Sequence, residues 1–249
     1  MRVNTDVLAA LDAAEINGDA LRLVGKLDRK LYETTNKVIE AAGGKWNRKA
    51  QAHLFDGSAA DAIEQIILTG EVTLVKQQFG QFDTPPSLAA SVIERARIEH
   101  GMSVLEPSAG IGNLARAASS AGGVVGCYEI DPKRIASLRA DEDKFSVIQQ
   151  ADFLTVEPQV IYDRVVMNPP FAKQDDIRHV LHAYKFLRPG GLLVAIMAAG
   201  IQFRTNQLTK TFLEHLQANG GTIEDLPPDA FRAAGANVRT VLVTIEATQ

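Results

Sequence analysis

The fold is decided by residues 103–131, which read SVLEPSAGIGNLARAASSAGGVVGCYEID. A short strand-like run at 103–106 leads into a turn with two glycines. An alanine-rich, helix-forming stretch then leads to a second apolar run at 124–130. This order predicts two parallel strands joined by a helix. Strands that are apolar throughout are typical of a sheet covered on both faces.

The same alternation continues downstream of this stretch. Further strands are expected at 145–150, 162–168, 190–198, 222–227 and 237–247, and helices at 131–140, 175–187 and 207–219. A helix at 87–99 precedes the first strand. We therefore predict an α/β domain over residues 79–249, built on a mostly parallel seven-stranded sheet with helices on both faces. Such sheets bind ligands at the carboxyl ends of their strands.

Residues 1–78 have a different pattern, of short helices and turns, which predicts a small, mainly helical extension. Helices are expected around 7–14, 31–42 and 58–68, and residues 45–55 (KWNRKAQAHLF) resemble a short hairpin. Trp46 is interpreted as a hairpin core residue in preference to a base-stacking one.

The extension is also basic. Residues 22–50 carry a charge of +5, from eight Lys or Arg and three acids, while the rest of the chain carries −9. This segment is either a phosphate-contacting patch or a solvated helix face, and both readings stay open.

Three carboxylates follow three successive predicted strands. Glu106 precedes Gly110 and Gly112, which let a ligand approach the backbone closely, and it suits the ammonium group of a zwitterion. Glu129, about twenty residues later, suits the two hydroxyls of a ribose. Asp152 suits an adenine amine, with Ile130 or Phe153 packed on the ring. The alternative for Glu106 is that it caps the following turn.

The segments LEPSAGIGNLA, YEID, ADFL and NPPF occur in this order. They resemble the class I S-adenosylmethionine-dependent methyltransferases, which have a Rossmann-like fold, and among them the NPPF amino-methyltransferases that act on N6 of adenine. The resemblance covers residues 80–245 and implies that S-adenosylmethionine is the cofactor. A motif resembling DTPPSLA would close over its methionine part. The implied cofactor-binding residues are Thr84, Pro85, Glu106, Pro107, Ser108, Ala109, Gly110, Gly112, Asn113, Glu129, Ile130, Asp152 and Phe153. Ala109 replaces the usual first glycine of the loop.

The catalytic residues implied by this resemblance are Asn168, Pro169, Pro170 and Phe171. An aromatic amine is a poor nucleophile because its lone pair is delocalised into the ring. The Asn168 side-chain oxygen and the Pro169 carbonyl can accept its hydrogens and draw it toward a pyramidal geometry, while Phe171 can stack on the base. Orientation and preorganised dipoles would supply most of the rate gain. Methylation of cytosine carbon 5 is disfavoured because the loop has no cysteine nucleophile.

The expected partner is nucleic acid, with DNA favoured over RNA and the target base flipped out of any duplex. Protein glutamine amides, ribosomal RNA amines, or a catalytically silent binding module are the alternatives. Phe171 in place of tyrosine favours nucleic acid. The basic segment or surface loops would contact the substrate. The loop residues Phe203, Arg204, Phe231, Arg232 and Arg239 are each either such contacts or ordinary surface or core residues.

No metal is expected, because His179 and His182 lack further ligands and are interpreted as a helix surface. No apolar run approaches the roughly 20 residues of a membrane span. The N-terminus does not resemble a secretory signal, and the single cysteine, Cys127, is interpreted as a packing residue of a cytoplasmic protein. The sequence does not indicate an oligomeric state.

Overall fold

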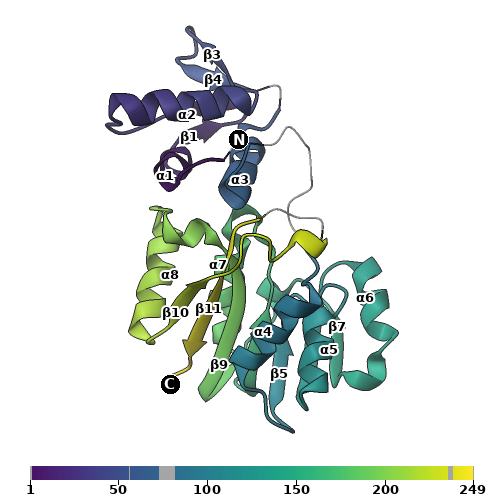
Figure 1. Ribbon diagram of the computed structural model, residues 1–249. Helices are drawn as coiled ribbons and strands as arrows, with labels where there is room; N and C mark the ends of the chain where they lie inside the picture. Colours follow the sequence, from purple (N-terminus) through teal and green to yellow (C-terminus); the bar gives the residue numbers. More distant parts are fainter. Residues whose placement is uncertain (1, 56, 73–81, 235–237, 249) are drawn as a thin grey trace. The chain divides into compact units, whose positions relative to one another are not determined.

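The computed structural model describes residues 2–55, 57–72, 82–234 and 238–248. The chain divides into two compact units, and Figure 1 traces it in sequence order. The first unit comprises Met1–Phe79 and Ala199–Lys210, and the second comprises Gly80–Ala198 and Thr211–Gln249. Among the described residues, no helix is both long and apolar enough to cross a membrane.

The second unit is built on a seven-stranded sheet with the order β10-β11-β9-β8-β5-β6-β7. The five strands from β5 to β9 pair in parallel, while β11 is antiparallel to both β9 and β10. The predicted mostly parallel seven-stranded sheet is therefore confirmed. Its strands are β5 (Ser103–Glu106), β6 (Val124–Glu129), β7 (Val147–Gln150), β8 (Tyr162–Met167), β9 (Leu187–Ala198), β10 (Thr222–Asp225) and β11 (Thr240–Glu246).

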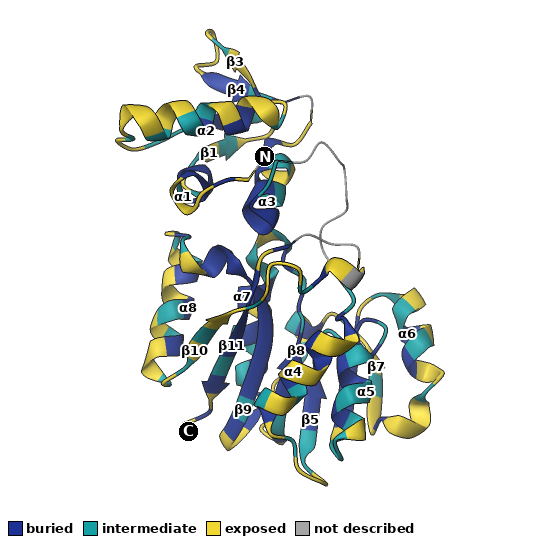
Figure 2. Cartoon of the chain, in the orientation of Figure 1, coloured by how far each residue is buried: buried dark blue, intermediate teal, exposed yellow. Residues whose placement is uncertain are grey.

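Helices pack on this sheet and bury its central strands. In Figure 2, β9 and β11 are dark blue while the outer surfaces of the helices are yellow. Contacts join α4 to β8 and β9, α5 to β5 and β6, and α7 to β9. The helices are α4 (Pro86–Ala96), α5 (Asn113–Ser120), α6 (Pro132–Arg139), α7 (Asp175–Tyr184) and α8 (Gln207–Ala218). Cys127 in β6 is fully buried, as expected of a packing residue.

The strand order creates a switch point between β5 and β8. The chain runs from β5 outward to β6 and β7, and then returns to place β8 on the other side of β5. The loops that leave β5 and β8 at their carboxyl ends therefore diverge in opposite directions and leave a crevice between them. These two loops contain Gly110 and Asn168, which lie 58 positions apart in the sequence.

The described residues between 2 and 72 in the first unit form three α-helices and a four-stranded antiparallel sheet with the order β1-β2-β4-β3. The expected helices and the expected hairpin at 45–55 are present. A second hairpin, β1–β2, was not predicted, although Asn17-Gly18 at its turn is a dipeptide typical of hairpin turns. The elements are α1 (Thr5–Asp12), β1 (Glu15–Asn17), β2 (Ala20–Arg22), α2 (Arg29–Ala41), β3 (Lys45–Asn47), β4 (Ala52–Leu54) and α3 (Ala59–Thr69).

The segment that follows β9 belongs to the first unit. Phe203 packs against the apolar cluster of that unit. Arg204 is 6% exposed and forms ion pairs with Asp12 at 3.2 Å and with Glu64 at 2.9 Å. Of the two readings of Arg204, the structure supports a packing role and not a contact to a base or phosphate, because its guanidinium already holds two carboxylates inside the first unit.

Two other expectations about aromatic residues are also corrected. Trp46 is 46% exposed and is therefore not a core residue of the hairpin, since its strand β3 lies at the edge of the small sheet. Phe231 is fully buried in the second unit and contacts Phe82 and Phe171. Phe231 is thus part of the packing in this structure. Arg232 and Arg239 are exposed.

Candidate active site

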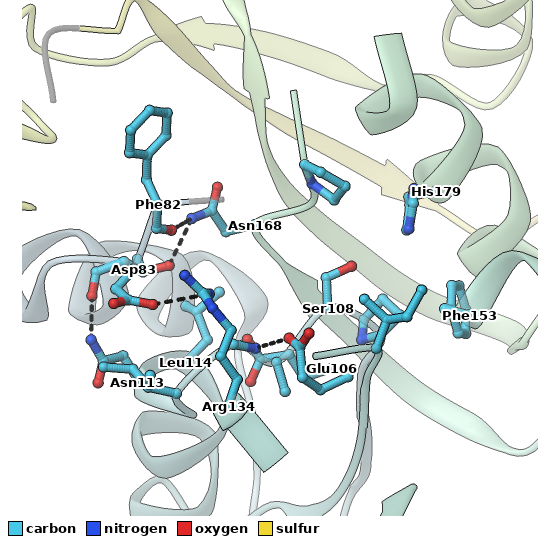
Figure 3. A pocket seen from close by; sticks show the side chains of 18 of the residues that line it. Phe82, Asp83, Glu106, Ser108, Asn113, Leu114, Arg134, Phe153, Asn168 and His179 are labelled. Carbon is cyan, nitrogen blue, oxygen red and sulfur yellow. Dashed lines mark hydrogen bonds and ion pairs between the residues drawn. The ribbon is translucent and has the colours of Figure 1, made fainter. Parts of the chain in front are cut away.

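A cavity of about 230 Å³ lies in the second unit, where β5, β6, β7 and β8 end. Figure 3 shows residues that line it. The structure brings together most of the residues expected from the sequence: Thr84, Glu106, Pro107, Ser108, Ala109, Gly110, Asn113, Glu129, Ile130, Asp152, Phe153, Asn168 and Pro170 all line this cavity. Pro85, Gly112, Pro169 and Phe171 are not among the described lining residues.

The glycine loop between β5 and α5 needs its glycines for conformational reasons. Gly110 and Gly112 have φ angles of +57° and +92°, in the left-handed region that side chains disfavour. A Cβ atom at Gly112 would also lie 2.7 Å from Cδ2 of Leu138. Gly112 does not line the cavity. It is the N-cap of α5, the helix that follows the glycine loop.

Glu129 at the end of β6 organises this loop. The backbone N–H of Gly110 donates to Glu129 Oε2 at 2.7 Å, and that of Asp131 donates to Oε1 at 2.8 Å. Each oxygen keeps one further acceptor position, because a carboxylate oxygen can accept two hydrogen bonds. Glu129 thus offers a fixed pair of acceptors to the cavity. Asp131 is the N-cap residue of α6, and its side chain accepts a hydrogen bond from the Lys133 N–H.

Glu106 at the end of β5 is the most unusual group in the cavity. It is 2% exposed, and its Oε2 atom has no hydrogen-bond partner within the described chain. Burial raises the pKa of this carboxyl well above its usual range, although the Ala115 backbone N–H opposes the shift. A buried acceptor without a donor is costly, so this oxygen is suited to a ligand that brings a cationic donor.

Asp152 and Ile130 form the other end of the cavity. Asp152 accepts a hydrogen bond from the Leu154 N–H at 3.1 Å, which holds the carboxylate at the start of the turn η2 (Phe153–Thr155). Ile130 is 54% exposed, so its side chain is available to pack on a planar ring. Phe153 is 2% exposed and its ring contacts Tyr128 and Phe186. Ile130 therefore offers more free apolar surface than Phe153 does.

Asn168, which directly follows β8, has a fixed orientation. Its Nδ2 atom donates to the Phe82 carbonyl at 2.8 Å and to Thr84 Oγ1 at 3.1 Å, as the dashed lines in Figure 3 mark. A backbone carbonyl can only accept, so the atom facing it must be the NH₂ group. The oxygen Oδ1 is buried and has no hydrogen-bond partner among the described residues. The amide therefore holds an unused acceptor in the cavity wall.

Phe171 does not occupy the place that was expected. Its side chain is 1% exposed and packs against Phe82 and Phe231, with ring centroids 6.4 Å and 6.2 Å away. In this arrangement the faces of its ring are covered, so it is not available to stack on a base. Its contact with Phe82 instead supports the segment whose carbonyl binds Asn168. The neighbouring Pro170 ring does line the cavity.

Several lining residues were missed by the sequence analysis, among them a histidine and an arginine. His179 on α7 is 9% exposed, which corrects its interpretation as a helix surface. Its Nδ1 atom lies 2.7 Å from the Asp175 carbonyl, and burial lowers its pKa. The pattern held a signal, because His179 lies three residues after the buried Asp176 and four before the buried Ala183. Arg134 on α6 also lines the cavity and forms an ion pair with Asp83 at 3.1 Å, which no local pattern indicated.

Comparisons with known proteins agree with this architecture. Residues 60–222 match the model of a family described as Methyltransferase small domain. The methyltransferase subunit of a type I restriction-modification system from Streptococcus thermophilus is 21% identical, with a TM-score of 0.61 over 76% of this chain and 49% of that chain. A proposed class I S-adenosylmethionine-dependent methyltransferase from Listeria monocytogenes is 17% identical, with a TM-score of 0.54 over 76% of this chain and 68% of that one. The chain thus spans about half the length of the first of these proteins. At these identities the two structures establish a shared fold.

Proposed function

Because this chain belongs to the methyltransferase small domain family, we propose that it transfers the methyl group of S-adenosylmethionine to the exocyclic amine of adenine in nucleic acid, with DNA favoured over RNA. The observation that carries this proposal is the state of Asn168. Its donor end is tied to Phe82 and Thr84, while its acceptor end is buried without a partner. An amine that brings an N–H group to Oδ1 satisfies that acceptor.

The residues of the cavity fit the cofactor. Glu106 offers an unpaired buried carboxylate oxygen to the ammonium group. Glu129 offers two fixed acceptors to the ribose hydroxyls, and Asp152 an acceptor to the adenine amine, with Ile130 against the ring. When bound, S-adenosylmethionine supplies a methyl group whose bond to the cationic sulfur breaks as its bond to the amine nitrogen forms.

The residues of the chain hold and polarise the amine. Asn168 Oδ1 accepts one N–H of the amine, and the Pro169 carbonyl accepts the other. The proline rings restrict the backbone that carries this carbonyl. Accepting both hydrogens localises the nitrogen lone pair, which makes the amine a better nucleophile. Formation of the new bond leaves the nitrogen positively charged, and it then loses one proton to water. Rigid dipoles of this kind reduce the barrier without reorganising during the reaction.

The experiment is mass spectrometry of nucleosides from DNA and from RNA treated with the protein and S-adenosylmethionine. We expect N6-methyladenine with the wild type. Asn168→Ala should lose about 100-fold or more of the activity, as when a preorganised polar group is deleted elsewhere. Calorimetry with S-adenosylmethionine is the matched control, and Asn168→Ala should still bind it.

The other outcomes separate the alternatives. Methylation of a protein glutamine amide, or of an RNA amine other than adenine, would contradict the adenine assignment. A folded protein that does not bind S-adenosylmethionine would support a silent module and would contradict the whole proposal.

A further inference from the structure

The hairpin β3–β4 in the first unit carries an exposed aromatic ring among exposed cations. We call this set the hairpin surface and define it as Arg22, Lys45, Trp46, Arg48 and Lys49. All five residues are exposed. Residues 41–55 contain four Lys, Arg or His side chains and no Asp or Glu, and Glu40 directly precedes them.

The tip of the hairpin is held in one conformation. Asn47 Oδ1 accepts hydrogen bonds from the backbone N–H groups of Lys49 at 2.9 Å and of Ala50 at 3.0 Å. The guanidinium of Arg22, on the neighbouring β2, donates to the carbonyls of Ala50 and Gln51, both at 3.2 Å. These bonds fix the backbone that presents Arg48 and Lys49. The cations therefore lie on an ordered support.

Trp46 presents an open ring beside this tip. Its indole meets the ring of His53 on the adjacent strand with centroids 5.1 Å apart and planes inclined by 62°. His53 itself is 2% exposed, so Trp46 is supported on one side by a buried residue. Nearly half of the Trp46 side chain remains open to solvent. A large flat ring exposed in this way is uncommon, because tryptophan is highly buried on average.

We propose that the hairpin surface binds a single-stranded stretch of nucleic acid, with a base stacked on Trp46 and phosphates bound by Arg48, Lys49 and their neighbours. An aromatic ring flanked by cations is the arrangement by which proteins bind unpaired strands without strong sequence preference. Paired and stacked bases present no free face to such a ring, so we expect the bound strand to be unpaired. This inference rests on the proposed function, and the hairpin surface would hold a part of the nucleic acid that lies outside the cavity.

The first test uses the fluorescence of Trp46, the only tryptophan of the chain. Titration with a single-stranded oligonucleotide should quench its emission as a base stacks on it. Trp46→Ala should weaken binding, measured by anisotropy of a labelled oligonucleotide, by about tenfold. Trp46→Phe should restore most of the affinity. Tyr32→Ala is the matched control, because Tyr32 is also exposed (43%) but lies on α2.

The second test uses the salt dependence of binding. Each phosphate contact to a single strand contributes about 0.7 to the slope of log K against log salt. Arg48→Ala/Lys49→Ala should therefore reduce that slope by about 1.4. The control Lys30→Ala/Lys37→Ala removes the same charge from exposed positions of α2 and should leave the slope nearly unchanged.

The inference would be overturned if Trp46 emission stayed unchanged at saturating oligonucleotide, or if the hairpin variants and the control variants had equal effects. It would also be overturned if a duplex bound this surface equally tightly, or if polyglutamate displaced the oligonucleotide at a similar concentration. Failure of the proposed function is distinguishable. Hairpin binding without methyl transfer by the wild type would contradict only the proposed function. Methyl transfer by a Trp46→Ala protein with wild-type oligonucleotide affinity would contradict only the hairpin inference.

Discussion

Thr84→Val should reduce kcat for methyl transfer by a small and calculable factor. The Thr84 hydroxyl accepts one of the two hydrogen bonds from Asn168 Nδ2, at 3.1 Å, while the Phe82 carbonyl accepts the other at 2.8 Å. Valine keeps the shape of the buried side chain but removes this acceptor. A neutral hydrogen bond contributes about 0.5–1.5 kcal/mol, which corresponds to roughly a two- to twelvefold change in rate if it orients Asn168 in the transition state.

The remaining bond to Phe82 should keep the Asn168 oxygen in the cavity, so the loss should stay far below that of Asn168→Ala. Steady-state kinetics with saturating cofactor measure kcat, and calorimetry measures the cofactor Kd separately. Thr84→Ser, which retains the hydroxyl, should stay close to the wild-type rate. A weaker cofactor Kd with unchanged kcat would refute the reasoning, since Thr84 would then act on the cofactor and not on Asn168.

Three further substitutions test other contacts. Glu106→Gln should weaken S-adenosylmethionine binding about ten- to a hundredfold by calorimetry. In the wild type that affinity should fall as the pH is lowered through the raised pKa of Glu106, because only the carboxylate holds an ammonium group. Because the folded protein holds the Glu106 proton more tightly than the unfolded chain does, the free energy of unfolding of the ligand-free wild type should decrease as the pH rises above the ordinary carboxyl range. Thermal unfolding measured as a function of pH should show this decrease in the wild type and not in Glu106→Gln. Arg204→Met should cost about 3 kcal/mol in urea unfolding by leaving the partly buried carboxylates of Asp12 and Glu64 without their cation, whereas Arg2→Met, which breaks an exposed ion pair, should cause no measurable change. Gly112→Ala should cost about 1–3 kcal/mol in thermal unfolding, because it places a Cβ at positive φ against a buried methyl group, and an unchanged Tm would contradict this.

Much of the second unit could be predicted because its inner strands, such as β6, β9 and β11, contain long apolar runs. That pattern arises from burial on both faces, and it is readable one strand at a time. The candidate site followed from the same logic. Parallel strands end at one edge of a sheet, so the positions of Glu106, Glu129, Asp152 and Asn168 after their strands were enough to bring them together.

Less of the first unit could be predicted from the sequence. The spacing of apolar residues indicated its helices. In the structure the side chains of Asp28 and Ser58 accept hydrogen bonds at the N-termini of α2 and α3. The β1–β2 hairpin was missed: its three-residue strands show no alternation, and the Asn17-Gly18 pair at its turn was the signal that could have revealed it. The assignment of residues 199–210 to this unit depends on the burial of Phe203 and Arg204 against partners more than a hundred positions away in the sequence.

The sequence by itself determined the sheet, the order of its strands along the chain and the acids at their ends, because each of these depends on local periodicity and on residue type. Only the tertiary structure decided how the side chains are paired. Asn168 is oriented by Phe82, 86 positions earlier, and Phe171 is covered by Phe82 and Phe231. Trp46 is exposed because its strand lies at a sheet edge. Such pairings are set by contacts between distant segments, for which a local pattern carries no signal.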